Sequence, residues 1–301
     1  MRYSISKICN IAIAFFAFSS NVFSQQVFKV SQFVQHNYIY NPAATGANEE
    51  SSLGVATRKM WSGIAGGPQT NIVFGDTYFS KMKTGLGVVL YSDKTGPTSR
   101  TGGQINLSYS INFKDDKRLM FGLQGIFMQY RIDKGSFAHY IPNDPLLLSS
   151  SNEMKGDAGA GIYYKSNTLN VGFSVQQLMQ SKLNFLKTSS NSEGKLYRHY
   201  FAGGHYNIRT DEDDVLVPNF MVNFVPNLPA DVEVGMRLEH KDLLFLGLNY
   251  HYRQGFGAYA GIKAYKKYSF GYNLSVYRTP LGIFEDGGQS HEFSLRYFFK
   301  K

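Results

Sequence analysis

Residues 104–113 read Gln-Ile-Asn-Leu-Ser-Tyr-Ser-Ile-Asn-Phe, a strict alternation of polar and apolar side chains. Successive side chains of a β-strand point to opposite faces, so this stretch places its polar residues on one face of a sheet and its apolar residues on the other. The same period of two recurs in residues 268–276 and 293–299. The pattern predicts β-strands in three distant parts of the chain.

A fourth alternating stretch, residues 230–239, carries charge on one face. Its aliphatic side chains are Val232, Val234, Met236 and Leu238, and the opposite face carries Asp231, Glu233, Arg237 and Glu239. Such a charged face is typical either of a solvated sheet surface or of the wall of a water-filled lumen. The stretch alone leaves both interpretations open.

Fourteen segments with this period predict an all-β, antiparallel protein. They begin near residues 51, 70, 84, 102, 118, 157, 169, 197, 215, 230, 243, 256, 268 and 292. Alternate connections are short, namely 80–83, 114–117, 165–167, 209–214, 240–242 and 266–267. The interleaved set contains long ones, namely 60–69, 133–156, 178–196 and 278–291, with 225–229 and 254–255 as short exceptions. Short turns at one end and long loops at the other are typical of a transmembrane outer-membrane β-barrel, here expected over residues 51–301.

A soluble β-sandwich is the alternative, because alternation is weak evidence for any one strand. Pro218 lies inside one expected strand, where it would remove a donor from the hydrogen-bond ladder. Against the sandwich, a soluble protein has no reason to sort its connections by length. An even number of strands also returns both chain ends to the periplasmic side of the membrane.

The first 24 residues have the anatomy of a secretory signal peptide. Arg2 and Lys7 form a positive region, residues 8–18 form an apolar region, and Val22-Phe23-Ser24 offers a cleavage site before Gln25. The single cysteine of the sequence, Cys9, lies in this leader, so the exported chain would need no disulfides. The leader contains two basic residues and no acidic ones, which lowers the net charge from +9 to +7.

Residues 25–50 do not read as a barrel strand. They contain Phe33 and Tyr38-Ile39-Tyr40, then the turn-forming sequence Asn41-Pro42-Ala43-Ala44-Thr45-Gly46. One interpretation is a tethered segment that plugs the lumen or contacts a periplasmic partner. The other is an extended lead-in to the first strand.

Three further features of the sequence are short motifs in a fixed order. The first is Tyr40-Asn41-Pro42-Ala43-Ala44-Thr45-Gly46, and the second is Arg58-Lys59-Met60-Trp61-Ser62-Gly63-Ile64-Ala65-Gly66-Gly67-Pro68-Gln69-Thr70, followed by Asp76. The third, Gly287-Gly288-Gln289-Ser290-His291-Glu292, precedes the last strand. Together these motifs resemble the PorP/SprF family of the type IX secretion system of Bacteroidota. Met60 replaces the glutamine usual in the family, and Lys300-Lys301 extend past the terminal aromatic strand.

The resemblance implies a non-enzymatic component of the secretion and gliding machinery in the cell outer membrane. Its implied partners are outer-membrane lipids, periplasmic lipoproteins, a peptidoglycan-binding protein of the machinery, and a secreted cargo or adhesin with a C-terminal secretion domain. An outer-membrane diffusion channel or substrate-selective channel of the same architecture is the alternative function.

The glycine-rich loop around the only tryptophan is the candidate site. Glycines let a backbone approach a partner closely, and a Trp supplies a large anchoring contact. The residues expected to bind a partner or cargo are Arg58, Trp61, Gly63, Ile64, Gly66, Pro68, Thr70 and Asp76, and those of the N-terminal motif are Asn41, Pro42 and Gly46. A Trp that merely anchors the loop at the membrane interface is the competing interpretation.

Other chemistry has little support in the sequence. No phosphate loop, dinucleotide fingerprint or nucleophile elbow is present, and Ser174 and His205 are not marked as a catalytic unit. No histidine pair has zinc-site spacing with a third ligand. Basic residues do not cluster with aromatic stacking sites, which argues against nucleic-acid binding. We therefore expect no catalytic residues, no metal and no cofactor.

Overall fold

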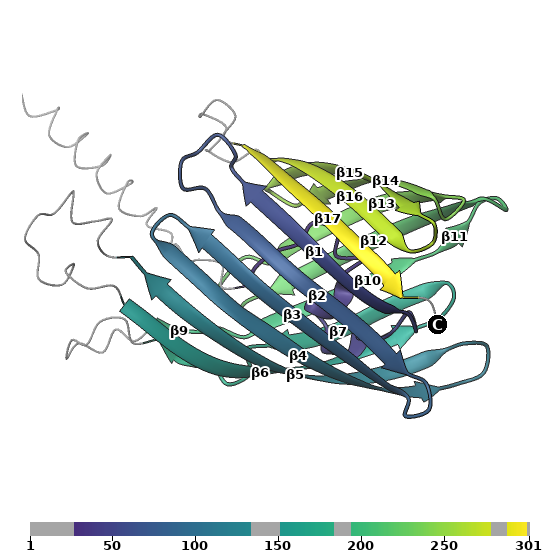
Figure 1. The fold of residues 1–301 in the computed structure, drawn as a ribbon, viewed down its shortest axis with the longest axis horizontal. Helices are drawn as coiled ribbons and strands as arrows, with labels where there is room; N and C mark the ends of the chain where they lie inside the picture. Colours follow the sequence, from purple (N-terminus) through teal and green to yellow (C-terminus); the bar gives the residue numbers. More distant parts are fainter. Residues whose placement is uncertain (1–26, 134–150, 184–193, 278–287, 300–301) are drawn as a thin grey trace, which may run out of the picture.

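The computed structural model is shown in Figure 1 and describes residues 27–133, 151–183, 194–277 and 288–299. The expected signal peptide, residues 1–24, lies outside the described residues. So do most of the long connections expected at 133–156, 178–196 and 278–291, and Gly287 of the third family motif.

The regular elements of the described residues are strands and two short 3-10 helices, η1(Asn37–Ile39) and η2(Pro42–Ala44). The strands are β1(Ser51–Met60), β2(Gln69–Phe79), β3(Thr84–Thr95), β4(Thr98–Asn112), β5(Arg118–Ile132), β6(Ser151–Lys165), β7(Leu169–Gln176), β8(Lys182–Leu183), β9(Gly194–Lys195), β10(His199–Tyr206), β11(Ile208–Arg209), β12(Asp214–Phe224), β13(Asp231–His240), β14(Leu244–His251), β15(Gly255–Ala264), β16(Tyr268–Tyr277) and β17(Gln289–Phe299). Within the described ranges, no helix has the length and apolar character needed to cross a membrane.

The main sheet closes on itself. β1 to β7 pair antiparallel in chain order, β7 pairs with β10, and β12 to β17 again pair in chain order, whereas β8 and β9 form a separate two-stranded sheet. β1 pairs with β17 from Ser51 opposite Phe299 to Met60 opposite Ser290. β10 and β11 both pair with β12 and share one position in the sheet, so the barrel has fourteen strands. The predicted fourteen-stranded antiparallel barrel is confirmed, and the soluble sandwich is wrong.

The barrel is apolar outside and polar inside. On β13, Val234, Met236 and Leu238 are 46%, 46% and 41% exposed, whereas Arg237 between them is 3% exposed. On β4, Asn106, Ser108 and Ser110 are buried, and Ile105, Leu107 and Tyr109 are about half exposed. A continuous apolar exterior of this extent would be anomalous in water and suits a lipid surrounding. The charged face of residues 230–239 is therefore the lumen wall.

Pro218 lies where the sheet has a gap. β10 pairs with β12 up to His205 opposite Asn219, and pairing resumes only at Ile208 opposite Leu216. Pro218 falls in this interruption, while its pairing with Met236 of β13 is uninterrupted. The missing N–H is thus tolerated because no ladder partner stands opposite it on that side.

Several strands begin earlier than the alternation indicates. β6 begins at Ser151 rather than near 157, because the β5–β6 hairpin continues to Ile132 opposite Ser151. β4 likewise begins at Thr98 rather than near 102, because it pairs with β3 up to the turn at Gly96 and Pro97. In both hairpins the backbone ladder extends beyond the part whose side chains alternate. The two-residue strands β8, β9 and β11 were not predicted.

Candidate functional site

The candidate site is the barrel lumen, which residues 27–50 occupy; we call this segment the plug (Figure 1). Near the end with short turns, the guanidinium of Arg118 donates to the carbonyl oxygen of Ala47 at 2.5 Å. Midway, Asn106 donates to the carbonyl oxygen of Tyr38 at 2.8 Å. Near the end with long loops, the N–H of Ser31 donates to Glu292 at 2.8 Å. The plug therefore runs through the lumen from the short-turn end to the long-loop end.

Local sequence explains the shape of the plug. The side chain of Asn41 accepts a hydrogen bond from the N–H of Ala43 at 3.0 Å and caps η2, whose first residue is Pro42. Gly46 then turns the chain toward β1 with a φ of +71°, a conformation that favours glycine. The three predicted motif residues Asn41, Pro42 and Gly46 thus shape the plug itself.

The lumen wall satisfies the backbone of the plug. Ser174 donates to the carbonyl oxygen of Tyr40 at 2.7 Å, and Ser108 to that of Thr45 at 2.7 Å. Gln176 donates to the carbonyl oxygen of Ile39 at 2.9 Å. Buried backbone groups without partners would destabilise this arrangement, so the polar lumen wall is complementary to the plug.

Close approach between plug and wall depends on glycine. A Cβ at Gly122 of β5 would collide with the backbone of Pro42 and Ala43. Around this contact, the plug contributes most of the apolar core, including Phe33, Tyr38 and Ile39, which pack with wall residues such as Phe74. The core of this protein therefore lies in the lumen rather than between two sheets.

His36 and Tyr40 of the plug are both buried and un-ionised. Burial, and then the positive charges of Arg296 and Arg237, hold the pKa of His36 well below its ordinary value. Its ring lies 4.5 Å from the ring of Phe74, between centroids. Burial raises the pKa of Tyr40 above its ordinary value, so its hydroxyl stays protonated. The docked plug therefore favours neutral side chains at both positions.

Asp76 holds the plug to the wall at the short-turn end. One carboxylate oxygen accepts hydrogen bonds from Ser52 at 2.7 Å and Arg296 at 3.0 Å, and the other accepts from the N–H of Gly46 at 3.1 Å. Arg296 also donates to the carbonyl oxygen of Gln35 at 2.7 Å. The first and second sequence motifs therefore meet at this carboxylate.

A second group of charges surrounds the plug near the long-loop end. We call it the mouth cluster; its members are Lys29, Arg58, Asp231, Glu233, His251 and Glu292. Arg58 donates to the carbonyl oxygen of Lys29 at 3.2 Å and to the hydroxyl of Tyr277 at 2.7 Å. Its Nε lies 3.9 Å from Glu292, and both side chains are almost fully buried. Lys29 forms an ion pair with Asp231.

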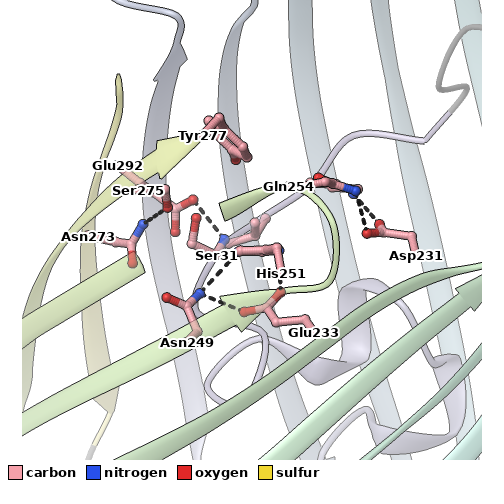
Figure 2. A network of polar contacts seen from close by, with 12 residues as sticks. Ser31, Asp231, Glu233, Asn249, His251, Gln254, Asn273, Ser275, Tyr277 and Glu292 are labelled. Carbon is pink, nitrogen blue, oxygen red and sulfur yellow. Dashed lines mark hydrogen bonds and ion pairs between the residues drawn. The ribbon is translucent and has the colours of Figure 1, made fainter. Parts of the chain in front are cut away.

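Figure 2 shows how β13, β14, β16 and β17 contribute to this network. Asn249 donates to Glu233 at 2.7 Å, and Nδ1 of His251 lies 3.5 Å from the same carboxylate. Gln254 donates to Asp231 at 2.9 Å. The plug is held directly by Asp231 of β13, Glu292 of β17 and Arg58 of β1, and the other residues of the network bond to one another.

The Trp61 loop is a tight turn at the long-loop end. Trp61 has a φ of +52° and is half-buried, and the N–H of Ile64 donates to its carbonyl oxygen at 2.8 Å. The N–H of Met60 donates to the carbonyl oxygen of Pro68 at 2.8 Å. The N–H of Gly96, in the turn between β3 and β4, donates to the carbonyl oxygen of Gly66 at 2.9 Å. Gly63 and Gly66 are exposed, whereas Ile64 and Pro68 are half-buried.

The residues predicted around Trp61 therefore fall into four places. Trp61, Gly63, Ile64, Gly66 and Pro68 form the loop at the long-loop end, and Arg58 lies below it in the mouth cluster. Thr70 donates to Asp93 at 2.6 Å within the wall. Asp76 lies at the opposite end of the barrel. The motif residues thus do not lie in one loop, and the polar residues Arg58, Thr70 and Asp76 bond to the plug or within the wall.

Sequence reasoning missed Lys29, Asp231, Glu233, His251 and Arg296 as members of this site. The one available signal was the charged face of residues 230–239, but nothing in the sequence paired it with residue 29. The hydroxyl of Ser174 donates its hydrogen bond to the plug backbone at Tyr40, and not to His205. Over the four described ranges, no group of three His, Cys, Asp or Glu side chains could hold a metal ion.

A closed antiparallel barrel with an apolar exterior and a filled polar lumen defines an outer-membrane β-barrel protein. The family model described as type IX secretion system membrane protein PorP/SprF matches residues 22–297. The chain therefore belongs to the PorP/SprF family, and its place is the outer membrane. Membership implies partners within the type IX machinery.

The chain is similar to several solved structures. The CymD monoaromatic hydrocarbon channel has a TM-score of 0.53 at 9% identity, with 92% of this chain and 95% of that chain covered. A Pseudomonas aeruginosa FadL homologue has a TM-score of 0.48 at 10% identity, covering 86% and 92%. The Ralstonia pickettii toluene transporter TbuX has a TM-score of 0.48 at 9% identity, covering 86% and 90%. At such identities the likeness concerns the fold alone. A comparison with curated proteins found no match.

Proposed function

We propose that this protein is a closed, non-enzymatic barrel of the type IX secretion and gliding machinery that binds partner and cargo proteins for export or surface anchoring. The cargo would be a secreted protein or adhesin with a C-terminal secretion domain. Periplasmic lipoproteins and a peptidoglycan-binding protein of the machinery are the partners expected at the short-turn end.

The observation that carries the proposal is the occupied lumen. The plug is bonded to the wall along its length, and two cavities beside it measure only about 30 Å³ each. A cavity of that size has room for one or two water molecules. A diffusion pathway for solutes would need a far wider opening, so a barrel held shut by its own chain is better suited to binding proteins than to conducting solutes.

The test is an affinity purification of the full-length protein from detergent-solubilised outer membranes, with mass spectrometry of what accompanies it. Recovery of a large secreted protein with a C-terminal secretion domain, or of type IX lipoproteins, is the expected result. Planar-bilayer recordings of the same preparation should show no steady conductance. A barrel recovered without partners even after cross-linking, together with a stable conductance, would favour the channel instead.

A further inference from the structure

The first residues of the plug are bound in a way that resembles a peptide in a receptor. We call residues 27–32 the strap. In the described sheet, no strand pairs with the strap, and its backbone is held by side chains. Arg58 donates to the carbonyl oxygen of Lys29 at 3.2 Å, the hydroxyl of Tyr40 accepts from the N–H of Val30 at 2.6 Å, and Glu292 accepts from the N–H of Ser31 at 2.8 Å.

Contacts of this kind can bind any extended peptide, because the wall bonds to the peptide backbone and not to its side chains. Arg58 and Glu292 belong to β1 and β17, which close the barrel, so both are fixed by the wall. Neither needs the strap's own sequence to present a donor or an acceptor. The site is therefore prepared for an extended backbone whichever chain supplies it.

Two side chains of the strap add selectivity. The ring of Phe28 lies 4.6 Å from that of Tyr91, between centroids, in a tilted arrangement. Lys29 pairs with Asp231. Both side chains and Glu233 line one of the two cavities of about 30 Å³ beside the plug. Without Lys29, the mouth cluster would contain three carboxylates, one guanidinium and the imidazole of His251. Its carboxylates then outnumber its guanidinium, which favours a cationic side chain.

The strap is also the part of the plug nearest to a partner outside the cell. It lies at the long-loop end, which faces outward in outer-membrane barrels. The side chains of both Lys29 and Asp231 are 21% exposed, so the ion pair is partly solvated and weaker than a buried one. Residues 41–46, by contrast, are enclosed by the wall at the other end.

We propose that the outer mouth is a binding site for an extended peptide of a partner protein, in which an aromatic residue is followed by lysine or arginine, and that the strap occupies this site as a tethered competitor. The partner's peptide replaces the strap while the rest of the plug stays docked. That the partner is a secreted cargo rests on the proposed function; the peptide site itself does not.

A synthetic fluorescent peptide with the sequence of residues 26–32, Gln-Val-Phe-Lys-Val-Ser-Gln, is the probe. Its binding to the purified full-length protein is measured by fluorescence anisotropy. The native protein should bind it weakly, because a tethered strap competes at an effective concentration on the order of millimolar. The Lys29→Glu variant should bind it at least tenfold more tightly, because a glutamate beside Asp231 and Glu233 expels the strap.

Matched controls separate this effect from a general change of charge. Lys117→Glu places the same charge change at an exposed position of the short-turn end and should leave peptide affinity unchanged. A peptide with glutamate in place of its lysine should not bind Lys29→Glu. Adding Asp231→Lys to Lys29→Glu should restore the strap through a reversed ion pair and reduce binding of the lysine peptide again.

Release of the strap is measured independently with the substitution Val27→Cys. The only native cysteine is Cys9, in the expected signal peptide, so maleimide labelling reports on position 27 alone. The introduced thiol should react slowly when Val27→Cys is the only change. It should react quickly when Val27→Cys is combined with Lys29→Glu, because the strap then leaves the mouth.

Two outcomes would overturn the peptide site. One is a thiol at position 27 that reacts quickly in the Lys29→Glu background while the peptide fails to bind. The other is a thiol that stays protected in that background. If either result is obtained while the affinity purification of the native protein still recovers cargo, the peptide site is wrong and the proposed function stands. Peptide binding without any recovered partner would overturn the proposed function instead.

Discussion

The backbone N–H of Gly46 donates a hydrogen bond to the carboxylate of Asp76 at 3.1 Å, which joins two sequence motifs that lie thirty positions apart. The other oxygen of that carboxylate accepts from Arg296 and Ser52. The buried carboxylate of Asp76 therefore binds the plug, the first strand and the last strand at one point. Its loss would leave the guanidinium of Arg296 without its ion partner inside the barrel.

Asp76→Asn should strongly destabilise the barrel. Removing one partner of a buried ion pair costs about 3–5 kcal/mol, because the remaining charge stays desolvated. Asp76 and Arg296 are 5% and 7% exposed in their side chains, so they fall in this class. The measurement is the urea midpoint of unfolding in detergent, followed by heat-modifiable migration on gels.

Asp115→Asn is the matched control, because Asp115 pairs with Lys117 at the surface and its side chain is 79% exposed. Exposed pairs contribute about 0–1 kcal/mol, so its midpoint should barely move. The double variant Asp76→Asn with Arg296→Met should be milder than Asp76→Asn alone, because no charge is left unpaired. Equal midpoints for Asp76→Asn and Asp115→Asn would contradict the assignment.

Gly122→Val should displace the plug and open the barrel to ions. The Cβ added at this position meets the backbone of Pro42 and Ala43, which cannot move aside as a flexible side chain would. Planar-bilayer recordings should then show a steady conductance that the native protein lacks.

Gly125→Val lies on the same strand and serves as the control. Gly125 is on the outward face, and a Cβ there meets nothing within 4 Å. This variant should remain closed and migrate normally. A closed Gly122→Val barrel that still folds would show that the plug does not seal the lumen.

Acid should weaken docking of the plug. The pKa of His36 is held well below its ordinary value of 6.5 when the plug is docked, so the undocked state binds an additional proton below that pH. Docking is therefore strongest above pH 6.5 and loses at most about 1.4 kcal/mol per pH unit as the pH falls toward the docked pKa. Conductance of the native barrel should rise between pH 6.5 and pH 5.

His36→Phe keeps a ring beside Phe74 but removes the titrating group, so its conductance should lose this part of the pH dependence. The same acid response in both proteins would assign the effect to other groups. A response that appears only above pH 6.5 would lie outside the range in which a histidine of lowered pKa affects docking.

Trp61→Ala should reduce recovery of partners in the affinity purification without changing the heat-modifiable migration of the barrel. Trp61 is half-buried at the long-loop end, and truncating a tryptophan anchor at an interface commonly costs about 2 kcal/mol or more. Trp61→Phe should retain most of the recovery because an aromatic ring remains. Full recovery of the partners with Trp61→Ala would show that Trp61 only anchors its own loop.

Much of the barrel could be predicted because each strand carries its own signal. The alternation at 104–113 needs no information from the rest of the chain, and the sorting of turns by length indicated a membrane barrel rather than a sandwich. Strand ends were less predictable. The hairpin of β5 and β6 extends to Ser151 through backbone pairing that leaves no mark in side-chain polarity.

The site was only partly predictable, for a related reason. Arg58 and Asp76 stood out through the motif around Trp61, yet the sequence grouped them with that loop. In the structure they lie at different heights of the lumen and bind the plug at Lys29 and Gly46. Glu292 was visible as part of a motif without any indication that Ser31 is its partner.

The fourteen-stranded barrel was predictable from the amino-acid sequence, because the period of two is a local property of each strand. What fills the lumen, and what the lumen charges bind, follows from the folded barrel. Closure brings β1 beside β17 and encloses residues 27–50, so that Lys29 meets Asp231 from a distant part of the chain. Contacts of that kind depend on which strands become neighbours, and no local pattern of side chains encodes them.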